Sequence, residues 1–148
     1  MSIQQDVVTK MKAAMKAKDT NALTALRALK SAFMLAQTEN GAGALSEAEE
    51  LKIVQKQVKQ RKDSAKVYQE QNRADLAEPE LAEVAVLEQF LPAALSEAEV
   101  EAIVVAVISE VGASGMKDMG KVMGLASKKL AGQADGNTIA KIVKAQLQ

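Results

Sequence analysis

The sequence contains no cysteine, no histidine and no tryptophan. Without cysteine there is no disulfide and no thiolate metal site, and without histidine the chain lacks the commonest general base and metal ligand. No apolar run approaches the roughly 20 residues that a membrane-spanning helix needs, and the N-terminal stretch lacks the apolar core of a secretory signal. We therefore expect a cytoplasmic protein with no membrane contact, no metal and no other cofactor.

Aromatic side chains are nearly absent, since the chain has one tyrosine and two phenylalanines. Alanine, leucine, valine and methionine supply most of the apolar residues, and such small or unbranched side chains favour helix over sheet. No segment shows the alternating pattern of a strand. A chain of 148 residues is long enough for an ordinary hydrophobic core, in one domain or two small ones. The composition predicts an all-α fold.

Helix starts are indicated by capping boxes, in which a serine stands three residues before a glutamine or glutamate. Residues 100–111, rich in β-branched side chains, would suit a strand, but a preceding cap and their apolar spacing favour a helix that stops at Gly112. Further back, a cap by Asp75 and Glu78 would place Pro79 in a first helical turn, or else that helix begins later. The capping boxes are Ser2 with Gln5, Ser46 with Glu49, and Ser96 with Glu99.

These signals predict two helical domains. Residues 1–92 are expected to form about four helices, the longest ending near Arg73. Residues 96–148 are expected to form a compact three-helix unit. The segment from Pro92 to Leu95 is the expected hinge between them.

Opposite charges balance in number but not in position. Lysine plus arginine equals aspartate plus glutamate, at 19 each. The charged residues of segment 96–111 are all glutamates, whereas segment 112–148 contains six lysines and only two acids, Asp118 and Asp135. Charge clustered in this way steers charged partners although it does not appear in the total.

The stretch SGMKDMGKVMG, residues 114–124, matches the nucleotide phosphate loop G-x-x-x-x-G-K-[ST] except at the last position, where Val122 replaces the hydroxyl residue that would hold magnesium. The stretch also follows a predicted helix instead of a buried strand. We therefore reject a nucleotide loop and predict an amphipathic helix over about residues 115–130. Its apolar face would be Met119, Val122, Met123, Ala126 and Leu130.

On that helix Lys117, Lys121 and Lys128 fall within about 40° of one another, opposite the apolar face. Gly120 and Gly124 lie beside them and would let another backbone come close. This stripe is a solvated helix face, a surface for RNA phosphates, or a protein contact. No aromatic residue interleaves with the lysines, so a nucleic acid would be held by phosphates and shape, without base stacking. Further lysines that add charge if the last two helices pack side by side are Lys129, Lys141 and Lys144.

Charged residues of the longest helix are expected on its outside. Arg61 is the exception, since it falls on the apolar stripe and should snorkel at the edge of the core. In the next helix Glu80 and Glu83 lie one turn apart, but nothing indicates an apolar pocket around them, so we assign no catalytic residue. The lysines that share one flank of the longest helix are Lys52, Lys56, Lys59 and Lys66.

Five stretches of the chain stand out together: LRALKSA at 26–32, KQRKDSA at 59–65, EQFLP at 88–92, MKDMGKVM at 116–123 and ADG at 134–136. Their order and spacing resemble one protein family, the YqeY proteins, and the match covers essentially the whole chain. The C-terminal half is similar to the tail domain of GatB, the B subunit of tRNA-dependent amidotransferases. The resemblance implies an all-helical protein with a helical N-terminal part and a three-helix C-terminal part.

In the amidotransferase that this resemblance points to, the tail engages tRNA while other domains carry out the kinase and amide-transfer chemistry. Family labels often read carbon–nitrogen ligase with glutamine as amido donor, yet this chain resembles the tail only and has no counterpart of the catalytic domains. The resemblance thus implies a non-catalytic accessory protein that binds tRNA or an aminoacyl-tRNA complex. The alternatives are a protein-interaction adaptor without nucleic-acid binding and an amidotransferase-type ligase in its own right. The candidate RNA-binding residues are Lys117, Gly120, Lys121, Gly124, Lys128, Lys129, Gly136, Lys141 and Lys144.

Overall fold

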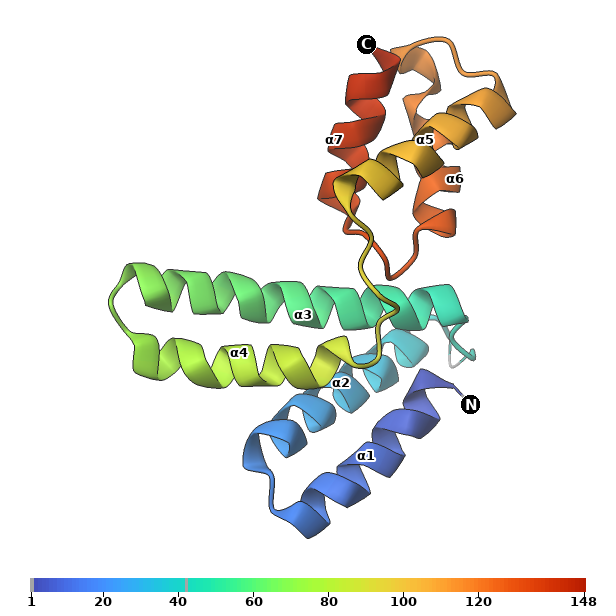
Figure 1. Ribbon diagram of the computed structural model, residues 1–148. Coiled ribbons are helices and arrows are strands. Elements are labelled where there is room, and N and C mark those ends of the chain that lie inside the picture. Colours follow the sequence, from blue (N-terminus) through green and yellow to red (C-terminus); the bar gives the residue numbers. More distant parts are fainter. Residues whose placement is uncertain (1, 42) are drawn as a thin grey trace. The chain divides into compact units, whose positions relative to one another are not determined.

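The computed structural model describes residues 2–41 and 43–148, and within these ranges the regular elements are all helices, with no strand. The predicted all-α fold is confirmed. Seven α-helices and one 3-10 turn follow one another along this part of the chain (Figure 1). Their bounds are α1 Ile3–Ala17, α2 Thr20–Glu39, α3 Glu47–Glu70, α4 Ala74–Glu88, α5 Glu97–Val111, η1 Met116–Asp118, α6 Met119–Lys129 and α7 Gly136–Leu147.

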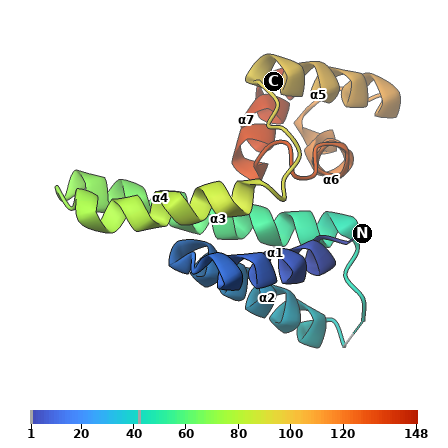
Figure 2. The same cartoon turned by 60° about the horizontal axis from the view of Figure 1, so that its bottom comes forward.

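The helices form two compact units, one ending at Leu91 and the other beginning at Pro92. In the first unit α1 and α2 form one helical hairpin and α3 and α4 form another, and α2 packs against both helices of the second hairpin (Figure 1, Figure 2). In the second unit each of α5, α6 and α7 packs against the other two. Each unit therefore has a core of its own.

Local capping residues begin most of these helices. All three predicted capping boxes are present: Ser2, Ser46 and Ser96 each accept a hydrogen bond from the N–H three residues on, and the side chain there accepts one in return. Asp19 and Asp135 cap α2 and α7 with their carboxylates. These side chains satisfy N–H groups that the start of a helix leaves without a partner in the helix.

The core of the first unit is built mainly from small and aliphatic residues of its four helices. Phe33 of α2, 1% exposed, and Phe90, 8% exposed, are its two buried aromatic residues. The buried members are Val7, Ala14, Ala22, Ala25, Leu26, Leu29, Phe33, Val54, Val58, Val84, Leu87 and Phe90.

One carboxylate also lies inside this unit. Glu50 of α3 is 4% exposed, and its oxygens accept hydrogen bonds from the backbone N–H of Ile3 (3.1 Å) and from Gln4 Nε2 (3.0 Å). Ile3 is the first residue of α1, so an acid on another helix satisfies one of the unpaired N–H groups at that helix start. The partial positive charge of a helix N-terminus also favours a carboxylate there.

Helix α4 departs from the prediction made for it. It begins at Ala74 without a side-chain cap, so Pro79 lies in its second turn. The sequence had predicted either Pro79 in the first turn or a helix that begins later. Asp75 pairs with Arg73 through two hydrogen bonds, of 3.0 and 2.9 Å, and this contact lowers the pKa of the Asp75 carboxyl. Proline at this position removes one hydrogen bond near the helix start, which the packing of the apolar residues further along α4 outweighs. The preceding helix, α3, ends at Glu70, slightly earlier than expected.

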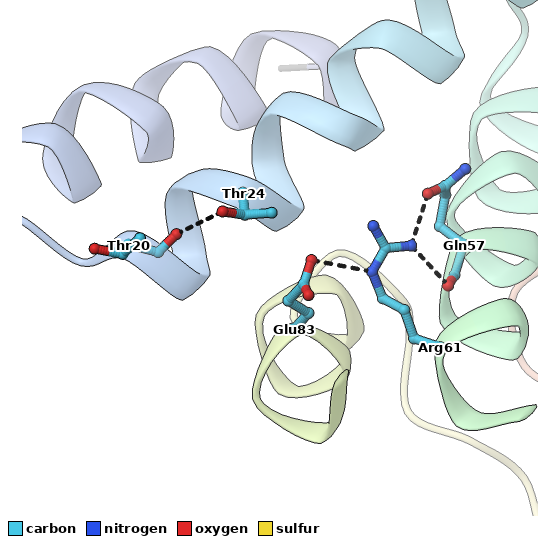
Figure 3. A network of polar contacts seen from close by, with 5 residues as sticks. All are labelled: Thr20, Thr24, Gln57, Arg61 and Glu83. Carbon is cyan, nitrogen blue, oxygen red and sulfur yellow. Dashed lines mark hydrogen bonds and ion pairs between the residues drawn. The ribbon is translucent and has the colours of Figure 1, made fainter. Parts of the chain in front are cut away.

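Arg61 of α3 lies at the edge of the core, as predicted, but its guanidinium is engaged by protein. Its Nε is 3.4 Å from Glu83 Oε1 on α4, and both side chains are 13% exposed. Its Nη1 donates to the backbone carbonyl (3.1 Å) and to the side-chain oxygen (2.8 Å) of Gln57, one turn back on α3 (Figure 3). Arg61 therefore joins α3 to α4.

In the second unit, the valine-rich segment forms α5, as predicted, and Gly112 ends it in the left-handed conformation at φ 65°. A hydrogen bond of 3.1 Å from Leu95 N–H to the Gln133 carbonyl ties the chain before α5 to the loop between α6 and α7. The buried core residues are Val100, Val104, Val107, Val122, Ala126, Leu130, Ile139, Val143 and Leu147.

Candidate nucleic-acid interface

The helix expected over residues 115–130 is divided in the structure. A 3-10 turn, η1, covers Met116–Asp118, and α6 begins only at Met119. The Asp118 carboxylate accepts a hydrogen bond from the Ser114 N–H (3.0 Å), which holds the chain in a tight turn ahead of the helix. Lys117 therefore lies outside α6, and the regular helical projection that grouped it with Lys121 and Lys128 was wrong for this residue.

A nucleotide phosphate loop joins a buried strand to a helix, whereas the element before this stretch is helix α5 and Val122 supplies no hydroxyl, so this stretch is not such a loop. The predicted apolar face is confirmed, with Val122 and Ala126 fully buried. Lys121 and Lys128 are exposed on the side turned away from it. Two helical turns separate them, which places them about 10 Å apart along the helix axis.

Gly120 and Gly124 do not serve packing inside the chain. A Cβ atom built on either glycine would meet no atom within 4 Å. Among the described residues no other segment of this chain approaches these glycines, so the space over them is open to a partner. Gly136, the first residue of α7, is also exposed and open in the same sense.

All six lysines of this unit are exposed, and five of them form no ion pair within the described residues. The exception is Lys129, whose Nζ lies 2.7 Å from Glu110 Oε2 on α5. The unpaired lysines lie on the 3-10 turn, on α6 and on α7, and the two helices pack against each other. We call this set the α6–α7 lysine face: Lys117, Lys121, Lys128, Lys141 and Lys144.

The two aspartates of this region both bind backbone N–H groups. Asp118 accepts from the Ser114 N–H, and Asp135 accepts from the Thr138 N–H (2.6 Å) as the cap of α7. Both carboxylates are thus used by the backbone. The α6–α7 lysine face keeps a local excess of positive charge although the unit as a whole contains as many acids as bases.

Lysines of the first unit are partly compensated. Lys59 pairs with Asp63 on the same helix (3.0 Å), and Lys62 pairs with Glu88 on α4 (2.8 Å). Glu83, one of the two glutamates that lie one turn apart on α4, is paired with Arg61.

In the described part of the chain, no group of three or more acidic side chains is placed to hold a metal ion. Nor does any helix there combine the length and apolarity needed to cross a membrane.

Comparison with known proteins adds a family and one relative. The family described as Yqey-like protein matches residues 4–147. A protein of Clavispora lusitaniae (strain ATCC 42720), named "Altered inheritance of mitochondria protein 41, mitochondrial", is 39% identical over 90 residues. That match covers 59% of this chain and 52% of the relative, so the chain spans about half the length of the relative it matches.

Proposed function

The chain belongs to the YqeY family, and we propose that it is a non-catalytic accessory protein that binds tRNA, or a complex containing it, through the α6–α7 lysine face. The observation that carries the proposal is the set of five exposed lysines without an acidic partner on adjacent elements of one small unit. Phosphates attract such a surface, and each phosphate neutralised by a lysine releases counterions from the RNA. The resemblance of this half to an amidotransferase tail supports tRNA as the RNA.

The proposed contact is to the RNA backbone. The three aromatic residues all belong to the first unit, where Phe33 and Phe90 are buried and Tyr68 is half-buried. The second unit therefore offers no ring for base stacking. Exposed glycines beside Lys121 and Lys128 leave room for a sugar–phosphate backbone against α6. Recognition would then depend on the shape of the RNA and its phosphate positions.

In this proposal the protein carries RNA to other catalysts and performs no amide transfer itself. A cytoplasmic location, where tRNA is used in translation, belongs to the same proposal, while the name of the fungal relative assigns that protein to mitochondria. Sequencing the RNA that copurifies with the protein from cells would establish whether tRNA is the class bound.

A gel-shift titration with tRNA at about 50 mM salt, where phosphate contacts are strong, tests the proposal. We expect retention by the native protein and its loss when Lys117, Lys121 and Lys128 are all replaced by glutamate. The matched control replaces three exposed, unpaired lysines of α3, Lys52, Lys56 and Lys66, by glutamate and should bind nearly as well as the native protein. Absence of binding by the native protein, or equal losses in both variants, would refute the proposal.

The second candidate is a protein-interaction adaptor without nucleic-acid binding. It is favoured by the outer side of α5, where Val105 is 47% exposed among small side chains. A stoichiometric protein partner that survives nuclease treatment, with no tRNA retained, would select this function instead.

A further inference from the structure

Helix α5 is apolar on both of its sides. Its inner side carries Val100, Val104 and Val107, which are fully buried against α6 and α7. A helix at a protein surface normally carries charged or polar residues on the side opposite its buried face. On its outer side the exposed residues carry no charge, and they fall within an arc of about 100°. They are Ala98, Ala102, Val105, Ala106 and Ser109.

This outer side is hollowed. A shallow depression of about 460 Å³ is lined by Ala98, Glu101, Ala102 and Val105. Because alanine side chains are short, another helix can approach α5 closely at this place and fill the depression with larger side chains of its own. We call this surface, with the five uncharged residues named above, the α5 outer face.

Acidic residues border the α5 outer face on both flanks. Glu97 and Glu101 lie along one edge, and Glu99 and Glu110 along the other. Glu110 is neutralised by Lys129, whereas Glu97, Glu99 and Glu101 form no ion pair within the described residues. The uncompensated charge therefore gathers beside the depression, in the N-terminal half of α5.

Charge decides which partner fits. RNA and anionic lipid would be repelled by three carboxylates. Two copies of α5 packed face to face would bring acidic flank against acidic flank, and this repulsion between like charges disfavours a second copy of this chain. A helix with large apolar side chains along one face and lysine or arginine on both flanks satisfies the depression and the carboxylates together.

We propose that the α5 outer face is a docking site for a basic amphipathic helix of a partner protein. The surface lies on the side of α5 opposite the core that joins it to α6 and α7, so it and the α6–α7 lysine face can be occupied at the same time. Helix α5 has 15 residues and is about 22 Å long. One face of a helix of this length offers less area than standard stable interfaces bury. The complex is therefore expected to be transient, with a dissociation constant in the micromolar range or weaker.

The test titrates the whole 148-residue chain with a synthetic 18-residue helical peptide, and binding is followed by chemical-shift changes of the backbone amides. The peptide carries leucine and methionine at i, i+3, i+4 and i+7 spacing and lysine on both flanks. We expect saturable shifts centred on α5. Ala102→Glu, at an exposed helical position, should weaken binding at least tenfold without unfolding the protein.

Charge reversal makes the test specific. A double variant, Glu97→Lys with Glu101→Lys, should lose affinity for the lysine peptide. It should gain affinity for a matched peptide that has glutamate in place of every lysine. Glu70→Lys, an exposed acid at the end of α3, serves as the control and should change neither affinity. Three results would each overturn the proposal. They are no binding by the native protein, peptide affinity that is unchanged in Ala102→Glu, and a stable dimer of the native protein that Ala102→Glu dissociates. The Ala102→Glu variant should keep its tRNA retention, which separates this test from that of RNA binding.

Discussion

Lys129 Nζ lies 2.7 Å from Glu110 Oε2, whereas Lys128, the residue before it, has no acidic partner among the described residues. Both lysines are exposed and belong to the last turn of α6. One charge is offset by a carboxylate of α5 and the other is free. The two neighbours therefore form a matched pair for testing which lysines meet phosphate.

Replacing Lys128 by glutamine is expected to weaken tRNA binding more than replacing Lys129 by glutamine. The free ammonium of Lys128 can pair with a phosphate at once, while that of Lys129 must first leave Glu110. Filter-binding titrations of the two variants at the same salt concentration measure the difference. Equal losses of affinity would show that the Glu110 pair has no influence on the contact.

Truncation of Glu83 should destabilise the first unit. In Glu83→Ala the guanidinium of Arg61, 13% exposed, keeps only the oxygens of Gln57 as acceptors. We expect a loss of about 1.5–3 kcal/mol in the free energy of unfolding, as for hydrogen bonds to charged groups. Urea unfolding measures it, and the double variant Arg61→Met with Glu83→Leu should recover most of the loss. A change below about 0.5 kcal/mol, typical of plain surface sites, would contradict this role of the pair.

The capping box of α3 predicts a small acid sensitivity. The Ser46 backbone N–H, 2.7 Å from Glu49 Oε2, lowers the pKa of the Glu49 carboxyl below its ordinary 4.5, and the Ser46 side chain acts in the same direction. A carboxyl whose pKa is lower in the folded state stabilises the fold above its unfolded pKa, and this contribution disappears as the pH falls through the folded pKa.

Glu49→Gln keeps a side-chain acceptor but cannot titrate. The stability advantage of the native protein over this variant should shrink as the pH is lowered from about 6 to about 3. Urea midpoints across that range measure it, and an advantage that is independent of pH would contradict the prediction. At a fixed neutral pH, Ser46→Ala should cost about 1 kcal/mol, as for other N-cap serines.

Gly124 offers a test that separates stability from binding. Because nothing lies within 4 Å of the position of its Cβ, Gly124→Ala should stabilise α6 by about 0.5–1 kcal/mol. Gly124→Leu should also be folded, since leucine is a better helix former than glycine, but its side chain would fill the space proposed for the RNA backbone. We expect tRNA affinity to fall several-fold for leucine and little for alanine. Unchanged affinity of Gly124→Leu would remove Gly124 from the proposed interface.

Local features of the fold could be predicted from the sequence. The boxes opened by Ser2, Ser46 and Ser96 are confirmed, because a capping box depends on residues three apart and on little else. The same is true of Gly112, whose left-handed conformation ends α5. The prediction for Pro79 failed because a local rule was applied where packing along α4 decided the outcome.

Contacts between helices could not be predicted in this way. Arg61 meets Glu83 across 22 residues, Lys129 meets Glu110 across 19, and Glu50 meets Ile3 across 47. No periodicity in one chain identifies such pairs, since they depend on how whole helices are placed. The candidate site shows both cases: every predicted RNA-binding residue is exposed, yet the sequence did not indicate which lysine is neutralised. Their role in RNA binding stays a prediction.

The salt dependence of tRNA affinity tests the central claim most directly. The logarithm of the association constant is plotted against the logarithm of salt concentration for the native protein and for a variant with Lys117, Lys121 and Lys128 replaced by glutamine. If these lysines neutralise phosphates, the slope of the variant should be shallower by about 2 to 3, at roughly 0.7–0.9 for each lost contact. Identical slopes for the two proteins would contradict the proposal that the α6–α7 lysine face holds RNA by its backbone.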